Sequence, residues 1–203
     1  MKLITSVGPN PHVVRMFIAE KGINVPTETI DIMKGENRQG PYLAKNPAGG
    51  SPCLALDNGT YLSEITAICE YLDEKFPQKS LLGATAEERA ETRMWTRRID
   101  LYVCEPMANG FRYGEGLAMF KPRITTLPEA SEGLKRLAQE KITWLDGLLG
   151  TKQYFCGNRI SLADVLLFCF LAFGAQVGQP LNPANKNIKA WYDRMAARPS
   201  AKA

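Results

Sequence analysis

The first third of the chain alternates between short strand patterns and one helical repeat. The stretches "MKLITS" at residues 1–6 and "PTETIDI" at residues 26–32 both have the pattern of a strand. Between them, residues 13–21 place Val14, Phe17 and Ile18 on one face of a helix, and Gly22 follows where that helix would end. This order predicts a β-α-β unit, whose right-handed crossover makes the two strands parallel.

The next segment has the pattern of a hairpin followed by a second helix. "CLALDNGTYL" at residues 53–62 reads as two short strands around the turn "DNG", a strong hairpin signal. Apolar residues then recur on one helix face up to Pro77, at Ile65, Ile68, Leu72 and Phe76. Together with the β-α-β unit, this predicts a small mixed sheet of four strands with helices packed on it.

The strand patterns stop at "PQKSLLGATAEERAE", which is rich in Pro, Gly and small polar residues. Residues 86–119, 129–149, 161–176 and 185–197 all have helical patterns. Ser161 and Asp164 form a capping box in front of the apolar run that follows. We therefore expect an α/β domain over 1–80 and an all-helical domain over 86–203.

Composition and charge exclude several classes of function. The 203 residues are 45% hydrophobic and 23% charged, with a net charge of +4 that is spread without a basic run, which disfavours nucleic-acid binding. The longest apolar run, "VLLFCFLAF", is too short to span a membrane. The five cysteines contain no C-x-x-C and the chain has a single histidine, His12, so a disulfide framework, a zinc site and a dithiol motif are disfavoured.

Four motifs follow one another along the chain: the turn "SVGPNPHVVR", the loop and strand "NPAGGSPCLALDNG", the helix start "YLSEITAICEYLDEKFP" and the capped helix "YFCGNRISLADVLLFCFL". In this order they resemble the cytosolic glutathione transferase family over nearly the whole chain. The resemblance implies a thioredoxin-like N-terminal domain that binds glutathione and a helical C-terminal domain that holds the second substrate. It also implies a cytoplasmic homodimer with glutathione as co-substrate and without a metal, nucleic-acid or membrane partner.

The resemblance implies a set of glutathione contacts in the first domain. Pro52 stands where the family has a cis-proline, with Ser51 pairing its backbone with the cysteinyl part of glutathione. Glu64 matches the acid that holds the γ-glutamyl ammonium, and Ile65 replaces the usual Ser or Thr, so that only its backbone N–H is left for the carboxylate. Asn37 replaces the family histidine at the glycyl carboxylate, and an ordinary solvated loop is the alternative.

The family's thiol-activating Tyr, Ser or Cys is missing from the first turn. "PNPH" resembles the "PNGH" of the nu class, which makes Asn10 the candidate, with Ser6 as a second one. The context also resembles a bacterial and fungal subgroup that relies on backbone amides, polar side chains and water. Lowering a thiol pKa by about two units requires roughly 2.7 kcal/mol, whereas one neutral hydrogen bond contributes about 1 kcal/mol. We therefore expect modest activation.

The second substrate is expected to contact the long helix at 86–119. The candidates are Met107, Phe111, Arg112 and Tyr113, with ordinary core packing as the alternative for the first two. The predicted activity is conjugation of the glutathione thiolate to small hydrophobic electrophiles. Two alternatives stay open: glutathione-dependent reduction of disulfides or peroxides, and a non-catalytic protein with the same fold that binds apolar ligands.

Overall fold

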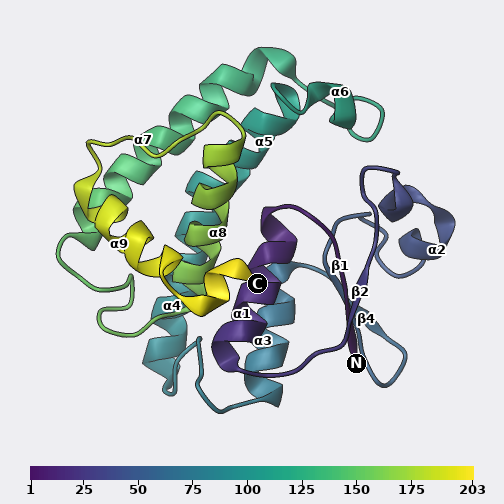
Figure 1. The fold of residues 1–203 in the computed structure, drawn as a ribbon, viewed down its shortest axis with the longest axis horizontal. Helices are drawn as coiled ribbons and strands as arrows, with labels where there is room; N and C mark the ends of the chain where they lie inside the picture. Colours follow the sequence, from purple (N-terminus) through teal and green to yellow (C-terminus); the bar gives the residue numbers. More distant parts are fainter. The chain divides into compact units, whose positions relative to one another are not determined.

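The computed structural model describes residues 1–203, which divide into two compact units (Figure 1). Unit 1 comprises Met1–Leu81 with Lys202–Ala203, and unit 2 comprises Leu82–Ala201. Unit 1 contains every strand of the sheet, and unit 2 is built of helices. The predicted fold class, a thioredoxin-like domain followed by a helical domain, is confirmed. No helix is both long and apolar enough to cross a membrane.

Unit 1 is organised around a four-stranded mixed sheet in the order β2-β1-β3-β4. The strands are β1 (Lys2–Thr5), β2 (Thr27–Thr29), β3 (Cys53–Ala55) and β4 (Tyr61–Leu62). β1 and β2 are parallel, as the crossover requires, whereas β3 is antiparallel to both β1 and β4. The predicted hairpin forms, and Gly59 takes a φ of 84°, which a residue without a side chain adopts readily.

Helices α1 (Pro9–Lys21) and α3 (Ile65–Lys75) lie side by side against the strands, and the short helix α2 (Gly40–Leu43) lies on the other side of them (Figure 1). A 3-10 turn, η1 (Glu36–Arg38), precedes α2. At the C-terminal ends of α1 and α3, the fully buried Lys21 ammonium lies 2.7 Å from Asp73 Oδ1. It also donates to the carbonyls of Gln78 and Lys79.

The structure starts α1 at Pro9, four residues before the predicted start at Val13. Two prolines in five residues suggest a turn when the sequence is read alone. In the first turn of a helix, however, a proline removes no hydrogen bond of the helix, because the backbone N–H groups there have no partner inside it. Asn10 therefore lies inside the first turn of α1 rather than in front of it.

Unit 2 consists of α4 (Ala86–Ile99), η2 (Asp100–Cys104, a π-helical turn), α5 (Glu105–Tyr113), α6 (Leu117–Phe120), η3 (Pro128–Ala130), α7 (Ser131–Leu149), α8 (Leu162–Gln176) and α9 (Lys186–Ala196). A short η4 (Pro199–Lys202) follows. The segment predicted as one helix over 86–119 thus contains a π-helical turn and ends its main run at Tyr113, before Gly114 and Gly116. All three tryptophans, Trp95, Trp144 and Trp191, belong to this unit.

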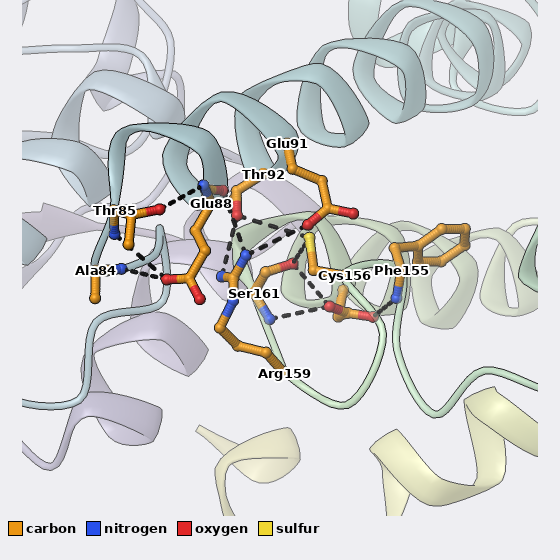
Figure 2. A network of polar contacts seen from close by, with 10 residues as sticks. Ala84, Thr85, Glu88, Glu91, Thr92, Phe155, Cys156, Arg159 and Ser161 are labelled. Carbon is orange, nitrogen blue, oxygen red and sulfur yellow. Dashed lines mark hydrogen bonds and ion pairs between the residues drawn. The ribbon is translucent and has the colours of Figure 1, made fainter.

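A polar network joins the start of α4 to the start of α8 inside unit 2 (Figure 2). Thr85 and Glu88 cap α4 with a capping box, and Arg159 donates to the Glu88 carbonyl and to Thr92 Oγ1. At α8 the predicted capping box of Ser161 and Asp164 is present. Because α8 is buried along most of its length, these polar groups fix its first turn inside the core.

Candidate functional site

Three strand ends meet at one end of the sheet in unit 1. The antiparallel register Ile4↔Cys53 places the residues after β1 beside those before β3, and Leu54↔Leu62 does the same for the residues after β4. The contact is direct between the first two segments, since Ser6 Oγ lies 2.8 Å from Ser51 Oγ. Glu64 comes two residues after β4 at the same end. The sheet therefore gathers Ser6, Ser51 and Glu64, three of the residues considered from the sequence.

The first turn of α1 offers few backbone donors. Gly8 is the N-cap with a φ of 112°, and its carbonyl accepts from His12 N–H. A helix normally leaves four N–H groups open at this end, but Pro9 and Pro11 have none. Only the N–H groups of Gly8 and Asn10 remain, with the half-buried Asn10 side chain between the two prolines. An anion at this helix end thus meets two backbone donors instead of four.

The start of α3 combines an acid with open backbone donors. Glu64 is exposed and is the N-cap of α3 with φ 69° and ψ 121°, a conformation that non-glycine residues rarely adopt. Ile65 and Thr66 follow as the first two helical residues, so their N–H groups have no partner within the helix. A carboxylate side chain and an anion-binding helix end therefore lie next to each other.

The segment before β3 has the geometry expected for its proline. The Ser51-Pro52 peptide bond is cis, Pro52 is buried and Ser51 is half-buried. Cys53, the next residue, is buried, and this burial raises the pKa of its thiol. All five cysteines of the chain are free and buried. Because a nucleophilic cysteine needs an accessible, easily ionised thiol, Cys53 does not have the properties of one.

Asn37 lies in η1, and its side chain contacts the loop in front of Ser51. Its side chain is buried, and Nδ2 donates to the Gly49 carbonyl at 2.6 Å. Its predicted contact with the glycyl carboxylate of glutathione stays a prediction. Sequence reasoning did not identify Tyr42 and Asn46, which both donate to the Gly50 carbonyl. The polar Asn46 before "PAGG" is a turn signal, whereas nothing in the local pattern marks Tyr42.

The four residues predicted for the second substrate have different surroundings within unit 2. Met107 has 0% exposure, and its Sδ and Cε lie within about 3 Å of the position that a Cβ on Gly174 would take, which is core packing. Phe111 packs edge-on against Phe120 and Phe173. Arg112 lies over the Phe120 ring. Arg112 also donates to Asn109, and Tyr113 is half-buried at the end of α5.

Comparison with known proteins places these features in a family. The family model "Glutathione S-transferase, N-terminal domain" matches residues 7–75, and "Glutathione S-transferase, C-terminal domain" matches residues 116–199. "Glutathione S-transferase 2" of Saccharomyces cerevisiae is 33% identical over 203 residues, which is 98% of this chain and 86% of the yeast protein. The chain belongs to the glutathione S-transferase family.

A solved structure supports the family assignment over the full length. The glutathione S-transferase domain-containing protein of Marinobacter aquaeolei superimposes with a TM-score of 0.93 at 32% identity, covering 99% of this chain and 100% of that one. A relative with a different named activity is the maleylacetoacetate isomerase of Pseudomonas aeruginosa, which is 29% identical over 98% of this chain and 93% of its own length. The family of this chain is therefore established, whereas the names of its relatives include more than one reaction.

Proposed function

We propose that the protein is a glutathione S-transferase that conjugates the glutathione thiolate to small hydrophobic electrophiles. The observation that carries this proposal is Glu64, held at a φ of 69° at the start of α3. A residue in this conformation destabilises the fold unless its surroundings compensate, and such residues concentrate at functional sites. Here the conformation keeps a carboxylate beside open N–H groups, which is the pair of groups that an amino acid's ammonium and carboxylate require.

Each part of glutathione then has a partner in unit 1. Glu64 holds the γ-glutamyl ammonium, and the Ile65 N–H takes the γ-glutamyl carboxylate. The backbone of Ser51, before Pro52, pairs with the cysteinyl part of the peptide, and Asn37 lies toward its glycyl end. The sheet register supports this arrangement, since it gathers Ser51 and Glu64 at one end of the sheet.

Asn10 is the proposed activator of the thiol. The thiolate would sit at the first turn of α1, where Asn10 supplies both a side-chain amide and one of the two open N–H groups. Two prolines reduce the backbone contribution, so this site is expected to lower the thiol pKa less than a site with a full set of donors. The turn resembles the nu class here, and Ser6 is an alternative whose hydroxyl is already bonded to Ser51.

Substituting Asn10 tests this assignment. In Asn10→Ala, we expect the pKa of the bound thiol to rise by about one unit, because about 1 kcal/mol of preferential thiolate stabilisation is lost. The ultraviolet absorbance of the thiolate in the complex, titrated against pH, measures this change. Asn24→Ala, at an exposed position after α1, is the matched control. Unchanged pKa and turnover in Asn10→Ala would remove Asn10 from the mechanism.

Three measurements on the unmodified protein separate the candidate functions. Retention on glutathione-agarose with turnover of a chloronitrobenzene supports the transferase. Retention with turnover of hydroxyethyl disulfide alone supports glutathione-dependent reduction, for which two glutathione molecules supply both thiols. Neither retention nor turnover would leave the non-catalytic binding protein. The scarcity of donors in the first turn is the observation that favours this last alternative.

The remaining proposals concern the second substrate and the assembly. We propose that Phe111, Arg112 and Tyr113, and less directly the buried Met107, shape the pocket for the electrophile on unit 2. The aromatic surroundings of Phe111 and the cation at Arg112 suit an apolar molecule with a polar edge.

We also propose that the protein is a cytoplasmic homodimer. Light scattering coupled to size-exclusion chromatography measures the molar mass of the assembly and so tests the dimer.

A further inference from the structure

Three consecutive backbone carbonyls in front of Ser51 are each held by a side chain from the preceding segment. Arg38 Nη1 lies 3.3 Å from the Ala48 carbonyl, and Asn37 Nδ2 lies 2.6 Å from that of Gly49. The Gly50 carbonyl accepts twice, from the Tyr42 hydroxyl at 2.5 Å and from Asn46 Nδ2 at 2.9 Å. We call Asn37, Arg38, Tyr42 and Asn46 the carbonyl clamp.

Three of the four clamp side chains, those of Asn37, Tyr42 and Asn46, are buried, whereas Arg38 is half-buried. Tyr42 is 5% exposed and Asn46 is 2% exposed, so neither side chain can exchange its bond to Gly50 for water without a penalty. Gly49 has a φ of 63°, and a Cβ there would lie 2.8 Å from Arg38 Nη1. The positive φ strains any residue that has a side chain, and a Cβ would also lie 3.1 Å from the Asn37 carbonyl oxygen, so this backbone course favours glycine.

Ser51 is held from its other side as well. The Ser6 hydroxyl donates to Ser51 Oγ at 2.8 Å, and Ser6 itself is fixed through its carbonyl, which accepts from Arg15 at 2.9 Å. The Ser51 backbone is thus fixed by the clamp ahead of it and by Ser6 beside it.

We propose that Tyr42, supported by Asn46 and by Ser6, is a positioning residue for glutathione: it fixes the backbone of Ser51 in the orientation that binds the cysteinyl part of the peptide. This inference rests on the proposed function. Tyr42 acts through Gly50 and Ser51, and its hydroxyl is bonded to a backbone carbonyl rather than directed at the thiol. Its removal should therefore weaken glutathione binding and leave the activation of the thiol as it is.

The ionisation of the Tyr42 hydroxyl distinguishes a residue that positions glutathione from one that activates its thiol. Burial raises the pKa of Tyr42 to about 12, so its hydroxyl stays a neutral donor throughout the pH range of an enzyme assay. A tyrosine that activated a thiol would change the pH dependence of turnover when it was removed. A positioning tyrosine would change affinity by the same factor at every pH.

The experiment compares the full chain with Tyr42→Phe, Ser6→Ala and the control Tyr71→Phe. The control deletes a hydroxyl in the same unit that bonds to Lys75 in α3. We expect Tyr42→Phe to raise the KM and the dissociation constant for glutathione about 5- to 10-fold, as for the loss of one buried hydrogen bond. Ser6→Ala should raise them by a smaller factor. For Tyr42→Phe and Tyr71→Phe, the kcat at saturating glutathione and the pH profile should match those of the unmodified protein.

The outcomes distinguish this inference from the proposed function. If the unmodified protein neither binds glutathione nor turns over with it, the proposed function fails and the inference fails with it. If the unmodified protein binds but Tyr42→Phe keeps a glutathione KM within twofold, the inference alone is wrong. A changed pH profile in Tyr42→Phe would also overturn it. Hydrogen exchange over residues 47–53 provides a second readout, and faster exchange in Tyr42→Phe, with α3 unchanged, supports the clamp.

Discussion

Glu64 combines an unfavourable backbone conformation with the glutathione contact that we propose for it. A left-handed backbone conformation at a non-glycine residue destabilises the folded state by about 1–3 kcal/mol. Glu64 has this conformation at an exposed position, where no burial of its side chain explains it. Under the proposed function, this destabilisation is offset by the binding that a carboxylate at this position provides.

Two substitutions at Glu64 should therefore separate stability from binding. We expect Glu64→Gly to be more stable than Glu64→Ala by about 1 kcal/mol, because glycine adopts the conformation without a clash, although it also gains freedom in the unfolded chain. Both variants should bind glutathione at least about tenfold more weakly, since the ammonium loses a charged partner. Chemical denaturation and calorimetric titration measure the two effects, with Glu74→Ala on α3 as the control.

Equal stability of the two variants would show that the backbone at Glu64 is not strained. Unchanged affinity in both would show that its carboxylate does not meet the ligand. Either result would remove the observation on which the proposed function rests.

Single residues differed in how well the sequence predicted them. The cis geometry at Pro52 was expected from the family motif, and the structure has it. The contact of Asn37 with Gly49 and the role of Tyr42 were not expected, because both depend on hydrogen bonds to a loop whose course is set by the whole unit. Local periodicity reports which face of an element is apolar and contains no information on such contacts.

At the scale of elements, the start of α8 illustrates a polar group built into a core. The Asp164 carboxyl has 0% exposure, and it accepts from Phe155 N–H, Trp191 Nε1, the Ser161 N–H and the Ser161 hydroxyl. Burial nevertheless raises the pKa of Asp164 to about 6. The four donors explain why the rise is not larger, since each of them favours the ionised form.

This raised pKa predicts that the Asp164 contribution to stability falls as the pH rises, whereas the contribution of an ordinary ion-paired carboxyl grows. In the folded state Asp164 keeps its proton up to about pH 6, whereas in the unfolded chain it loses it near pH 3.8. The stability contributed by the protonated form is complete below the lower value and is lost as the pH rises through the higher one. Relative to Asp164→Asn, which does not titrate, the wild type should lose about 2–3 kcal/mol between pH 4 and pH 6.5.

Denaturant unfolding of both proteins at several pH values measures this difference. A difference in the free energy of unfolding that stays constant across the range, or that grows in favour of the wild type with rising pH, would contradict the assigned ionisation. The comparison with Asp164→Asn is needed because exposed carboxyls such as Asp31 and Asp57 have lowered pKa values, which act in the opposite direction.

Most elements were predictable, and their ends were less so. The strands, α1, α3 and the helices of unit 2 follow from apolar periodicity, and the capping box at Ser161 marked the start of α8 correctly. The predicted start of α1 was too late, because a proline usually ends a helix but is also common at the first helical position. The π-helical turn at η2 and the short α2 were missed, since neither alters the period over a long enough stretch to be recognised.

At the scale of the whole molecule, each unit contains a buried aspartate whose carboxylate is stabilised in a different way. In unit 2 Asp164 is surrounded by neutral donors, whereas in unit 1 Asp73 is paired with the fully buried Lys21. Ser80 Oγ and Leu81 N–H also donate to Asp73, which ties the segment after α3 to the end of α1. The ion pair therefore fixes the last residues of unit 1.

Removing the cation from this pair should destabilise unit 1 strongly. In Lys21→Met the apolar stem is kept, but Asp73 becomes a buried carboxylate without a counter-charge, which costs about 3–5 kcal/mol when one partner of a buried pair is deleted. Lys75→Met, at an exposed position on α3, should leave the free energy of unfolding close to that of the wild type, because an exposed ion pair contributes little. Denaturation followed by far-ultraviolet circular dichroism measures both, and similar values for the two variants would contradict a stabilising role for the pair.

The distribution of tryptophan makes the two units optically distinguishable. Because Trp95, Trp144 and Trp191 all lie in unit 2, the intrinsic tryptophan emission of the protein reports on the helical unit alone, whereas circular dichroism reports on both. A denaturation profile in which ellipticity changes before emission would mean that unit 1 opens first. Coincident profiles would mean that the chain unfolds as one cooperative body. The native tryptophans therefore report whether the two units of this glutathione S-transferase family member unfold together or separately.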